Sequence, residues 1–428
     1  MERFTGLLGI AAILATAFLL SNNRKAINYR VVISGLLIQA VLAVFILKVP
    51  FGQTLFGAIG AAVTKLLSFS DRGGEFVFGA LVKNDLMAQS FGGENTFIFF
   101  FKIVPTIIFV AVLVSVAYHL GLMQRIVSLV ARAVYHTMGV SGSEALSNVA
   151  SIFVGQVEAQ IMIQPYLKGM TRSELLASMA GSMACIAGGV MAVYIALGIP
   201  APYLLAASLM AAPGALVISK IMYPETEVSE TKGEVKIEVK RQHANLVDAI
   251  SHGAGDGLKV ALNVVAMLIG FIALIALVDY TIGYTGHLLS AYAGLTPERL
   301  GGFDLSKVSL NSILGVLFSG VAWLMGVPSS DIQQAGSLMG TKMVVNEFVA
   351  YLDLVKMNAA HSLQPKTQMI VSFAICGFAN FSSIAIQVGG IGQLAPERRK
   401  DLAQLGFRAL IAGTLASYLS ATLAGLLF

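Results

Sequence analysis

The feature that most constrains this chain is a series of apolar runs, most of them long enough for a helix to cross roughly 30 Å of hydrocarbon. The runs recur from end to end, at about 4–20, 30–48, 96–120, 174–198, 201–222, 260–280, 367–391 and 405–427. Because only 12% of the residues are charged and 56% are hydrophobic, little polar surface is left for contact with water. The sequence therefore predicts an all-α polytopic membrane protein with about eight transmembrane helices, whose surroundings are a lipid bilayer.

One polar segment divides the chain into two membrane halves. Residues 224–243 hold nine charged residues and no large apolar cluster, as a solvated linker does. Three further stretches, at about 54–70, 246–259 and 297–308, have helical periodicity but contain too many polar or small residues to face lipid. They are predicted to be interfacial helices. The expected organisation has N-terminal helices in 1–95, a first transport repeat in 96–223, a cytoplasmic or interfacial linker in 224–245, and a scaffold helix with a second transport repeat in 246–428.

Basic residues indicate the topology rather than a nucleic-acid partner. The segments "NNRKAINYR" after the first run and "PERRKD" before the last are densely basic, so both are predicted to lie in the cytoplasm and both termini outside. The remaining lysines and arginines are scattered in short segments and form no basic face, although the net charge is +5. We therefore expect no nucleic-acid binding.

Two segments are too polar for ordinary membrane spans, and each carries a glutamate among apolar residues. These are 139–170, with Glu158 in "IFVGQVEAQIMI", and 326–357, with Glu347 in "KMVVNEFVAYL". An uncompensated carboxylate at that depth costs several kcal/mol, so each should face a cavity or a partner. The alternative is a glutamate at a hairpin tip near the water interface. Lys342 lies close to the second glutamate, with either a substrate contact or a structural role at the hairpin.

The two polar segments have similar patterns. In each, an acidic residue follows serine (Glu144 and Asp331), and an amide with a glutamate follows about 15 residues later. A long apolar helix with a glycine or polar interruption comes next, at about 174–198 and 367–391, and aligning Cys185 with Cys376 places Gly189 on Asn380. This pattern is typical of two structural repeats, each a re-entrant helical hairpin followed by a broken helix. Backbone groups freed by such breaks survive in lipid only where they line a polar cavity.

The side chains expected around this cavity indicate a neutral solute with several hydroxyl groups. They supply amide, carboxylate and hydroxyl groups, at Gln156, Glu158, Asn346, Glu347, Asn380, Ser382 and Ser383. Carboxylates accept hydrogen bonds from adjacent hydroxyls, and amides match the edge of a heterocycle.

At these residues the chain resembles the concentrative nucleoside transporter family. The stretches "GQVEAQIMIQPYL", "GTKMVVNEFVAYLDL" and "CGFANFSSIAI" look like its three signature segments, and the resemblance extends over essentially the whole chain. It implies a homotrimer in a bacterial inner membrane, with a scaffold and a mobile transport region. It also implies a secondary active transporter that imports nucleosides by cation symport with elevator-like alternating access, and that is neither an enzyme nor dependent on a cofactor.

The resemblance assigns roles to individual residues. The base-facing positions are Gln156, Val157, Glu158 and Val190. The ribose-facing positions are Glu347, Asn380 and Ser383, with Phe378 beside the sugar. The positions that coordinate sodium in sodium-coupled members are Ser151, Val154, Cys185 and Ile186.

The chain departs from the family pattern at three places. Val157 stands where the family commonly has Thr or Ser, and Gln160 and Gln164 replace a proline and a basic residue. The lost hydroxyl removes a hydrogen bond of about 0.5–1.5 kcal/mol, which favours purine over pyrimidine nucleosides. At the ion position, Ser151 and the thiol of Cys185 suit a hard cation less well than the family's side chains. Proton coupling is therefore favoured over sodium, with Glu158 or Glu347 as the carrier.

Several other interpretations remain open. The alternatives within the fold are a sodium-coupled or pyrimidine-preferring transporter, a transporter of another polar solute, or a channel. A membrane-embedded hydrolase is remote, because no HExxH or GxSxG motif accompanies the paired carboxylates. The histidines are dispersed, at His119, His136, His243, His252, His287 and His361, and are expected to be solvated or capping residues rather than ligands. No metal site other than the sodium alternative is predicted.

Overall fold

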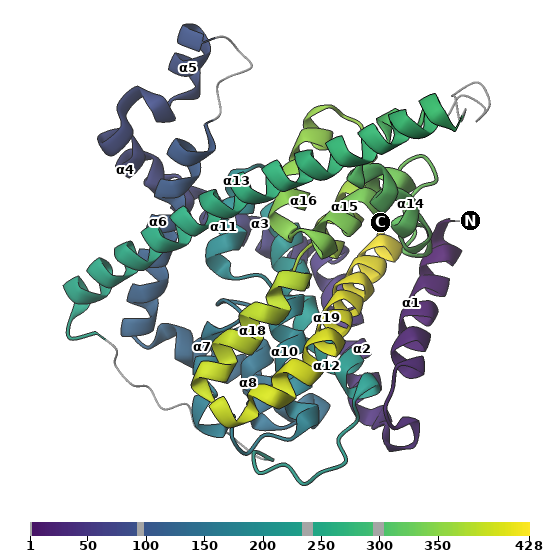
Figure 1. The fold of residues 1–428 in the computed structure, drawn as a ribbon. Coiled ribbons are helices and arrows are strands. Elements are labelled where there is room, and N and C mark those ends of the chain that lie inside the picture. The colour runs from purple at the N-terminus through teal and green to yellow at the C-terminus, as the bar shows by residue number, and fades with distance from the viewer. Residues whose placement is uncertain (1, 92–97, 233–242, 294–303) are drawn as a thin grey trace.

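The computed structural model describes residues 2–91, 98–232, 243–293 and 304–428 (Figure 1). Every regular element in these ranges is a helix, which confirms the all-α prediction. The first half contains α1 (Glu2–Leu19), α2 (Tyr29–Leu47), α3 (Pro50–Leu67), α4 (Phe69–Phe78), α5 (Asn84–Phe91), α6 (Phe99–His119), α7 (Leu122–Met138), α8 (Gly142–Ala150), α9 (Glu158–Ile161), α10 (Arg172–Ala184), α11 (Gly188–Ala196) and α12 (Ala201–Met222). The second half contains α13 (Leu246–Tyr292), α14 (Leu310–Leu324), α15 (Ile332–Val344), α16 (Glu347–Ala359), α17 (Pro365–Ala374), α18 (Phe381–Leu394) and α19 (Arg399–Leu427).

The chain is a multi-pass membrane protein. Six helical segments of the described residues are long and apolar enough to cross a membrane: Tyr29–Leu47, Phe99–His119, Arg172–Ala196, Ala201–Met222, Leu246–Tyr292 and Pro396–Leu427. Two shorter apolar helices, Thr5–Leu19 and Leu310–Leu324, accompany them. The second of these, α14, is absent from the predicted spans, because its apolar run is only 15 residues long.

The centre of the molecule is formed by α12 and α19, which pack on each other and on α2 and α10. Within an 18-residue apolar stretch of each helix, 89% is buried inside the protein in α12, against 11% in α13. Gln39 on α2 is fully buried, and its Nε2 donates to Met210 O at 2.8 Å and to Ser420 Oγ at 3.1 Å. Such interhelical hydrogen bonds help to hold helices together where lipid removes the hydrophobic driving force.

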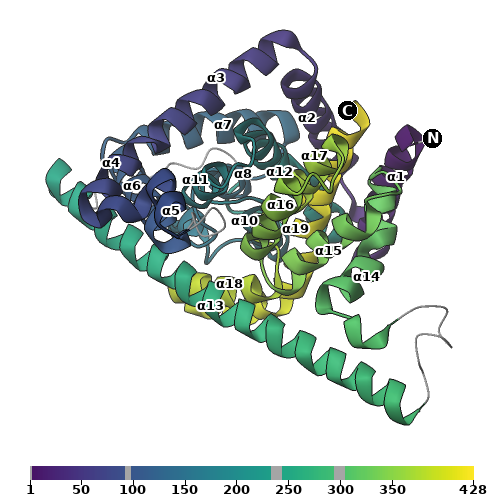
Figure 2. The same cartoon turned by 90° about the horizontal axis from the view of Figure 1, so that it is seen from above.

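Helix α13 corrects one prediction. The sequence predicted an interfacial helix at 246–259 and a separate span at 260–280, but both belong to one continuous helix of 47 residues that runs along one edge of the molecule (Figure 2). The small residues that look like a boundary instead pack against α6. A Cβ on Gly257 would lie 2.7 Å from Ile108 Cα, so glycine permits this close approach without interrupting the helix.

The other predicted interfacial helices have different outcomes. The stretch at 54–70 belongs mostly to α3. The stretch at 297–308 lies largely outside the described residues, which resume at 304 and contain a short 3-10 helix at Leu305–Lys307. The amphipathic helix α7 was not predicted, because hydropathy alone does not detect a helix with polar residues on one face.

The first part of the linker packs against the helices instead of being fully solvated. Lys220 Nζ donates to Glu144 Oε1 at 2.5 Å and lies 3.4 Å from Glu225 Oε2. Thr231 Oγ1 donates to Glu174 Oε1 at 2.9 Å. These contacts tie residues at the end of α12 and the start of the linker to α8 and α10.

Both long apolar helices predicted to be interrupted are divided in the structure. α10 ends at Ala184 and α11 begins at Gly188, whereas α17 ends at Ala374 and α18 begins at Phe381. The two interruptions touch, because Phe378 N donates to Cys185 O at 3.2 Å. Ser208 contacts both cysteines. Its carbonyl oxygen accepts from Cys185 Sγ at 3.8 Å, and its Oγ lies 3.8 Å from Cys376 Sγ. The aligned cysteines thus occupy corresponding places at the crossing of the two interrupted helices.

Candidate functional site

Glu347 is the buried carboxylate at the start of α16. Asn346 caps this helix, its side chain accepting from Val349 N at 2.9 Å. Glu347 is only 6% exposed, and its Oε1 accepts from Tyr194 Oη at 3.2 Å while its Oε2 accepts from Asn380 Nδ2 at 3.1 Å. A helix N-terminus and two donors therefore stabilise a negative charge at this position.

Asn380 is oriented by the helix that it begins. It is the N-cap of α18, where its Oδ1 accepts from Ser383 N at 2.9 Å and from Ser382 Oγ at 2.7 Å. Because the oxygen is occupied by these two donors, the amide NH2 group is directed to Glu347. The cap thus sets both the start of α18 and the position of one donor to the carboxylate.

Gln156 connects this group to the first half of the chain. Its Nε2 donates to Ser383 Oγ at 3.4 Å, and its Oε1 accepts from Gln387 Nε2 at 3.3 Å. Gln387 Nε2 also donates to Met179 O on α10 at 3.2 Å. The structure therefore brings four of the predicted site residues into one buried group, which we call the central polar group: Gln156, Glu347, Asn380 and Ser383.

Ser382 also joins this group through its bond to Asn380, whereas Val157, Glu158, Val190 and Phe378 contribute no side-chain hydrogen bond to it in the described part of the chain. Val157 is half-buried against α18, since a Cβ on Gly390 would lie 2.5 Å from Val157 Cγ2. Val190, in the first turn of α11, and Phe378, in the second interruption, are half-buried. Glu158 differs from Glu347, because it is exposed at the start of the four-residue helix α9.

The side chains at the predicted ion position already have partners within the protein. Ser151 Oγ donates to Ser147 O at 2.8 Å and lies 2.9 Å from Ser182 Oγ. The thiol of Cys185 is directed to Ser208 O. Val154 and Ile186 are buried beside them.

Two residues of the site were missed from the sequence, Tyr194 and Gln387. Tyr194 is fully buried and donates to Glu347, and Gln387 bridges Gln156 to α10. Each lies four residues after a predicted contact residue on the same helix, Val190 and Ser383 respectively. Helical spacing therefore carried the signal that would have found them.

Lys342 places a second charge close to Glu347. It lies on α15, is fully buried, and its Nζ has no hydrogen-bond partner among the described residues. Its charge attracts Glu347. Because an isolated buried charge is costly, this attraction offsets part of the cost of burying the two groups together.

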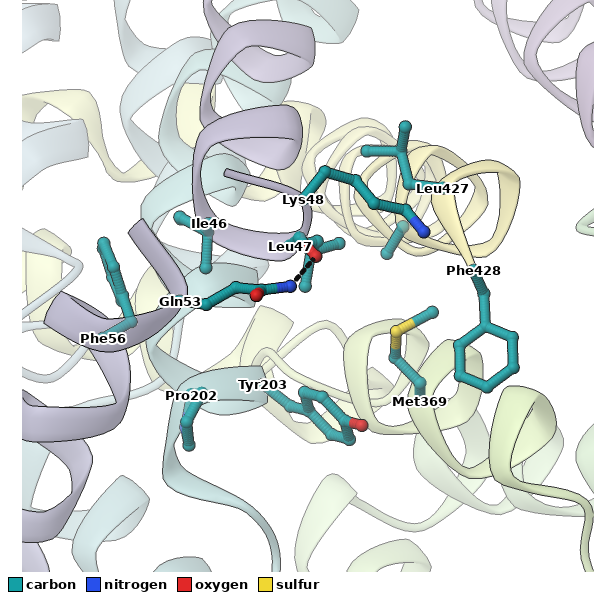
Figure 3. A pocket seen from close by; sticks show the side chains of 11 residues that line it. Ile46, Leu47, Lys48, Gln53, Phe56, Pro202, Tyr203, Met369, Leu427 and Phe428 are labelled. Atoms are coloured by element: carbon teal, nitrogen blue, oxygen red, sulfur yellow. Dashed lines mark hydrogen bonds between the residues drawn. The ribbon is translucent and has the colours of Figure 1, made fainter. Parts of the chain in front are cut away.

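A pocket of about 420 Å³ lies elsewhere in the molecule (Figure 3). It is lined by residues of α2, α3, α12, α17 and α19 and of adjoining turns, namely Ile46, Leu47, Lys48, Gln53, Phe56, Pro202, Tyr203, Met369, Ala424, Leu427 and Phe428. Gln53 Nε2 donates to Leu47 O at 2.6 Å within it. No residue of the central polar group lines this pocket.

Family models match almost the entire chain. The model described as "Na+ dependent nucleoside transporter C-terminus" matches residues 203–425, and the corresponding N-terminal model matches residues 8–81. A model described as "Nucleoside recognition" matches residues 100–201, between the two. The chain belongs to the concentrative nucleoside transporter family. The members it resembles are transporters and permeases, not enzymes.

Individual members of the family align with this chain over nearly its full length. The nucleoside permease NupC of Helicobacter pylori is 38% identical over 98% of this chain and 96% of the permease. The solved structure of CNTnw in an inward-facing substrate-bound state is 41% identical, with a TM-score of 0.91 over 100% of this chain and 98% of that one. A CNTnw variant in an outward-facing state is 42% identical and also has a TM-score of 0.91, with the same coverage. The family fold is therefore known in both inward-facing and outward-facing states.

Proposed function

We propose that this protein imports nucleosides across a bacterial inner membrane by secondary active transport coupled to a cation. The observation that carries the proposal is the central polar group, in which Glu347, Asn380 and Ser383 meet Gln156 at the starts of α16 and α18. The similarity of the chain to a nucleoside permease and to sodium/nucleoside cotransporters also supports nucleosides as the substrate class.

Glu347 is suited to bind the sugar. A carboxylate can accept about four hydrogen bonds, and Tyr194 and Asn380 supply two of them. The remaining lone pairs can accept from two adjacent hydroxyl groups, as the ribose of a nucleoside presents. Asn380, Ser383 and Phe378 would complete the sugar contacts.

The base would lie toward Gln156, Val157, Glu158 and Val190. Gln156 offers an amide for the edge of a heterocycle, while Val157 offers an apolar surface held against α18. An apolar side chain at this position supports a preference for purine nucleosides over pyrimidine nucleosides. A pyrimidine-preferring transporter is the alternative.

The ion position supports proton coupling rather than sodium coupling. Ser151 and Cys185 make hydrogen bonds inside the protein, and a thiol is a poor ligand for a hard cation. Glu158 is exposed and can exchange a proton with water, which favours it as the carrier over the buried Glu347. Sodium at Ser151, Val154, Cys185 and Ile186 is the alternative.

The proposed mechanism is alternating access of an elevator type. The segments 139–170 and 326–357 would be re-entrant hairpins that move with the two interrupted helices, as the inward-facing and outward-facing relatives suggest. In this arrangement, the basic turns after α1 and before α19 lie in the cytoplasm and both termini lie outside. Helix α13 has only 11% of its apolar stretch buried within the chain, so it has apolar surface left for contacts outside it. It would contribute to a homotrimer scaffold.

The test is uptake of radiolabelled inosine, guanosine, adenosine, uridine and cytidine into proteoliposomes under an imposed proton or sodium gradient. We expect proton-driven, purine-biased uptake that a protonophore abolishes. Glu347→Gln removes a charged hydrogen-bond acceptor and should lower uptake roughly 10- to 150-fold, which corresponds to about 1.5–3 kcal/mol.

Asp353→Asn is the matched control, because Asp353 is a carboxylate on the same helix that pairs with Lys356 at the surface. It should leave uptake within about twofold. Uptake that requires sodium at neutral pH would reject proton coupling. The absence of nucleoside uptake under either gradient, in folded protein, would reject the substrate class.

A further inference from the structure

Three histidines that are dispersed in the sequence meet where α13 begins. His243 precedes the helix, His252 lies in its second turn, and His119 ends α6. The ring centroids of His243 and His252 are 5.2 Å apart, and those of His119 and His243 are 6.4 Å apart. Asp248, in the first turn of α13, lies close to both His243 and His252. Histidines that are dispersed along the sequence are therefore neighbours in the structure.

The hydrogen bonds of Ser115 determine which nitrogen of His243 is free. Ser115 Oγ donates its single proton to Ala249 O at 2.7 Å. It must therefore accept from His243 Nε2, which lies 3.3 Å away. The neutral His243 ring then carries its hydrogen on Nε2 and presents a lone pair at Nδ1. This Nδ1 atom is buried and has no hydrogen-bond partner among the described residues.

The lone pair of His243 Nδ1 faces a carboxylate at a distance too long for a hydrogen bond. Nδ1 lies 3.9 Å from Asp248 Oδ2, and His252 Nε2 lies 3.6 Å from Asp248 Oδ1. Nevertheless, one ligand atom from each of the three residues lies within 4.8 Å of the other two. Two ligands at about 2.0–2.1 Å from a tetrahedral zinc ion are roughly 3.3 Å apart, so small side-chain rotations would close these distances around an ion.

The three side chains are held in place by their surroundings. Asp248 Oδ2 accepts from Ala244 N at 2.9 Å, and Asp248 N donates to Asn245 Oδ1 at 2.9 Å in the helix cap. Asp248 and His252 are four residues apart on α13 and share one face of the helix. Ser115 supports His243 from α6, as an outer-shell partner supports a metal-binding imidazole. The side chain of His252 is 63% exposed, which gives an ion a path from the solvent.

We propose that His243, Asp248 and His252 form a binding site for a divalent transition-metal ion of the zinc class. Two imidazole nitrogens and one carboxylate oxygen are a ligand set that suits such ions and leaves one coordination position open. His119 lies close by, and its Nδ1 is buried without a hydrogen-bond partner in the described ranges. A bound ion would fix the start of α13 and the end of the linker against α6. The site is separate from the central polar group and independent of the proposed transport function.

The test is metal binding to the full-length protein in detergent, with any affinity tag removed and metal stripped by a chelator. Zn²⁺ is titrated by calorimetry, and Co²⁺ by the visible absorption of its tetrahedral complex. We expect one ion per chain. His252→Asn should weaken binding roughly 100-fold or more, because loss of a ligand exceeds the 10- to 100-fold cost of losing an outer-shell partner. Zn²⁺ should also raise the thermal unfolding midpoint of the unsubstituted protein but not that of His252→Asn.

His287→Asn is the matched control, since His287 is an exposed histidine on the same helix, outside the cluster. It should bind metal like the unsubstituted protein. Because His252 is exposed, its substitution should leave folding intact, which a monodisperse gel-filtration profile would verify. The absence of stoichiometric binding, equal binding by His252→Asn, or equal loss in both variants would overturn the proposal and leave these residues with hydrogen-bonding and ion-pair roles alone.

Discussion

The two halves of the chain place a glutamate in different environments. In the second half, Glu347 begins the 13-residue helix α16, is buried, and accepts from Tyr194 and Asn380. In the first half, Glu158 begins the four-residue helix α9 and is exposed. One half therefore holds a buried carboxylate between two donors, and the other holds a carboxylate open to water. This division matches the roles proposed for substrate binding and proton exchange.

The interruptions of the two long helices also differ, in their length and in how closely their glycines pack. The second spans residues 375–380 and includes Gly377, whose φ is +131° and whose Cβ would lie 2.5 Å from Ala184 O. The first is shorter, and a Cβ on Gly189, just after it, would meet Val110 Cγ1 at an ordinary 3.8 Å. Of these two glycines, only Gly377 lies against backbone of the other interrupted helix.

The largest expected effect is on this contact. Gly377→Ala should destabilise the protein by roughly 3 kcal/mol, because it adds backbone strain and pushes Ala184 away. Gly189→Ala, in the first turn of α11, should be neutral or slightly stabilising because alanine favours a helix by up to about 1 kcal/mol over glycine. Thermal unfolding of both purified variants in detergent measures the difference. Equal stability of the two would contradict the asymmetry between the interruptions.

A smaller effect would separate the two glutamates by function. A pH gradient of one unit stores about 1.4 kcal/mol per proton, enough for tenfold accumulation of a substrate. Glu158→Gln removes the proton carrier but keeps an amide that can contact the base. Proton-driven accumulation should therefore fall to about the external concentration, while nucleoside exchange between preloaded and external pools continues. In Glu347→Gln both activities should fall together. If Glu158→Gln still accumulates nucleosides, the exposed glutamate is not the proton carrier.

The smallest effect concerns Val157, at the proposed base contact. Val157→Thr restores a hydroxyl that should provide one hydrogen bond, worth about 0.5–1.5 kcal/mol. The ratio of uridine to inosine uptake should rise by roughly 2- to 10-fold, as measured by competition in proteoliposomes. Val157→Ala, which adds no hydroxyl, is the control. A similar rise in both variants would show that cavity size rather than hydrogen bonding sets the preference.

Much of the helical architecture follows from local pattern. Hydropathy located α2, α6, α12 and α19 and the apolar segments that contain α10 and α18, because burial in lipid imposes long apolar runs. It failed at α13 and α14 for opposite reasons. The glycines of α13 resemble a boundary until their packing on α6 is known, and α14 is too short to stand out from its surroundings.

The candidate site was predictable to the extent that motif residues carry it. Glu347, Asn380, Ser383 and Gln156 were singled out from their sequence and meet in the structure. Tyr194 and Gln387 were not, since neither stands in a recognisable motif. The cluster of His243, Asp248 and His252 was also missed, because the unpaired Nδ1 atom depends on Ser115, on a helix more than a hundred residues earlier.

Apolar length and short motifs are local properties, so they suffice to identify this chain as a helical membrane protein of the nucleoside transporter family. Which polar groups become partners depends instead on how distant helices pack. Whether a carboxylate is a buried acceptor such as Glu347 or an exposed one such as Glu158 depends on side chains brought from distant helices. Burial and hydrogen bonding, which control the cost of charge inside a membrane protein, are properties of packing rather than of sequence.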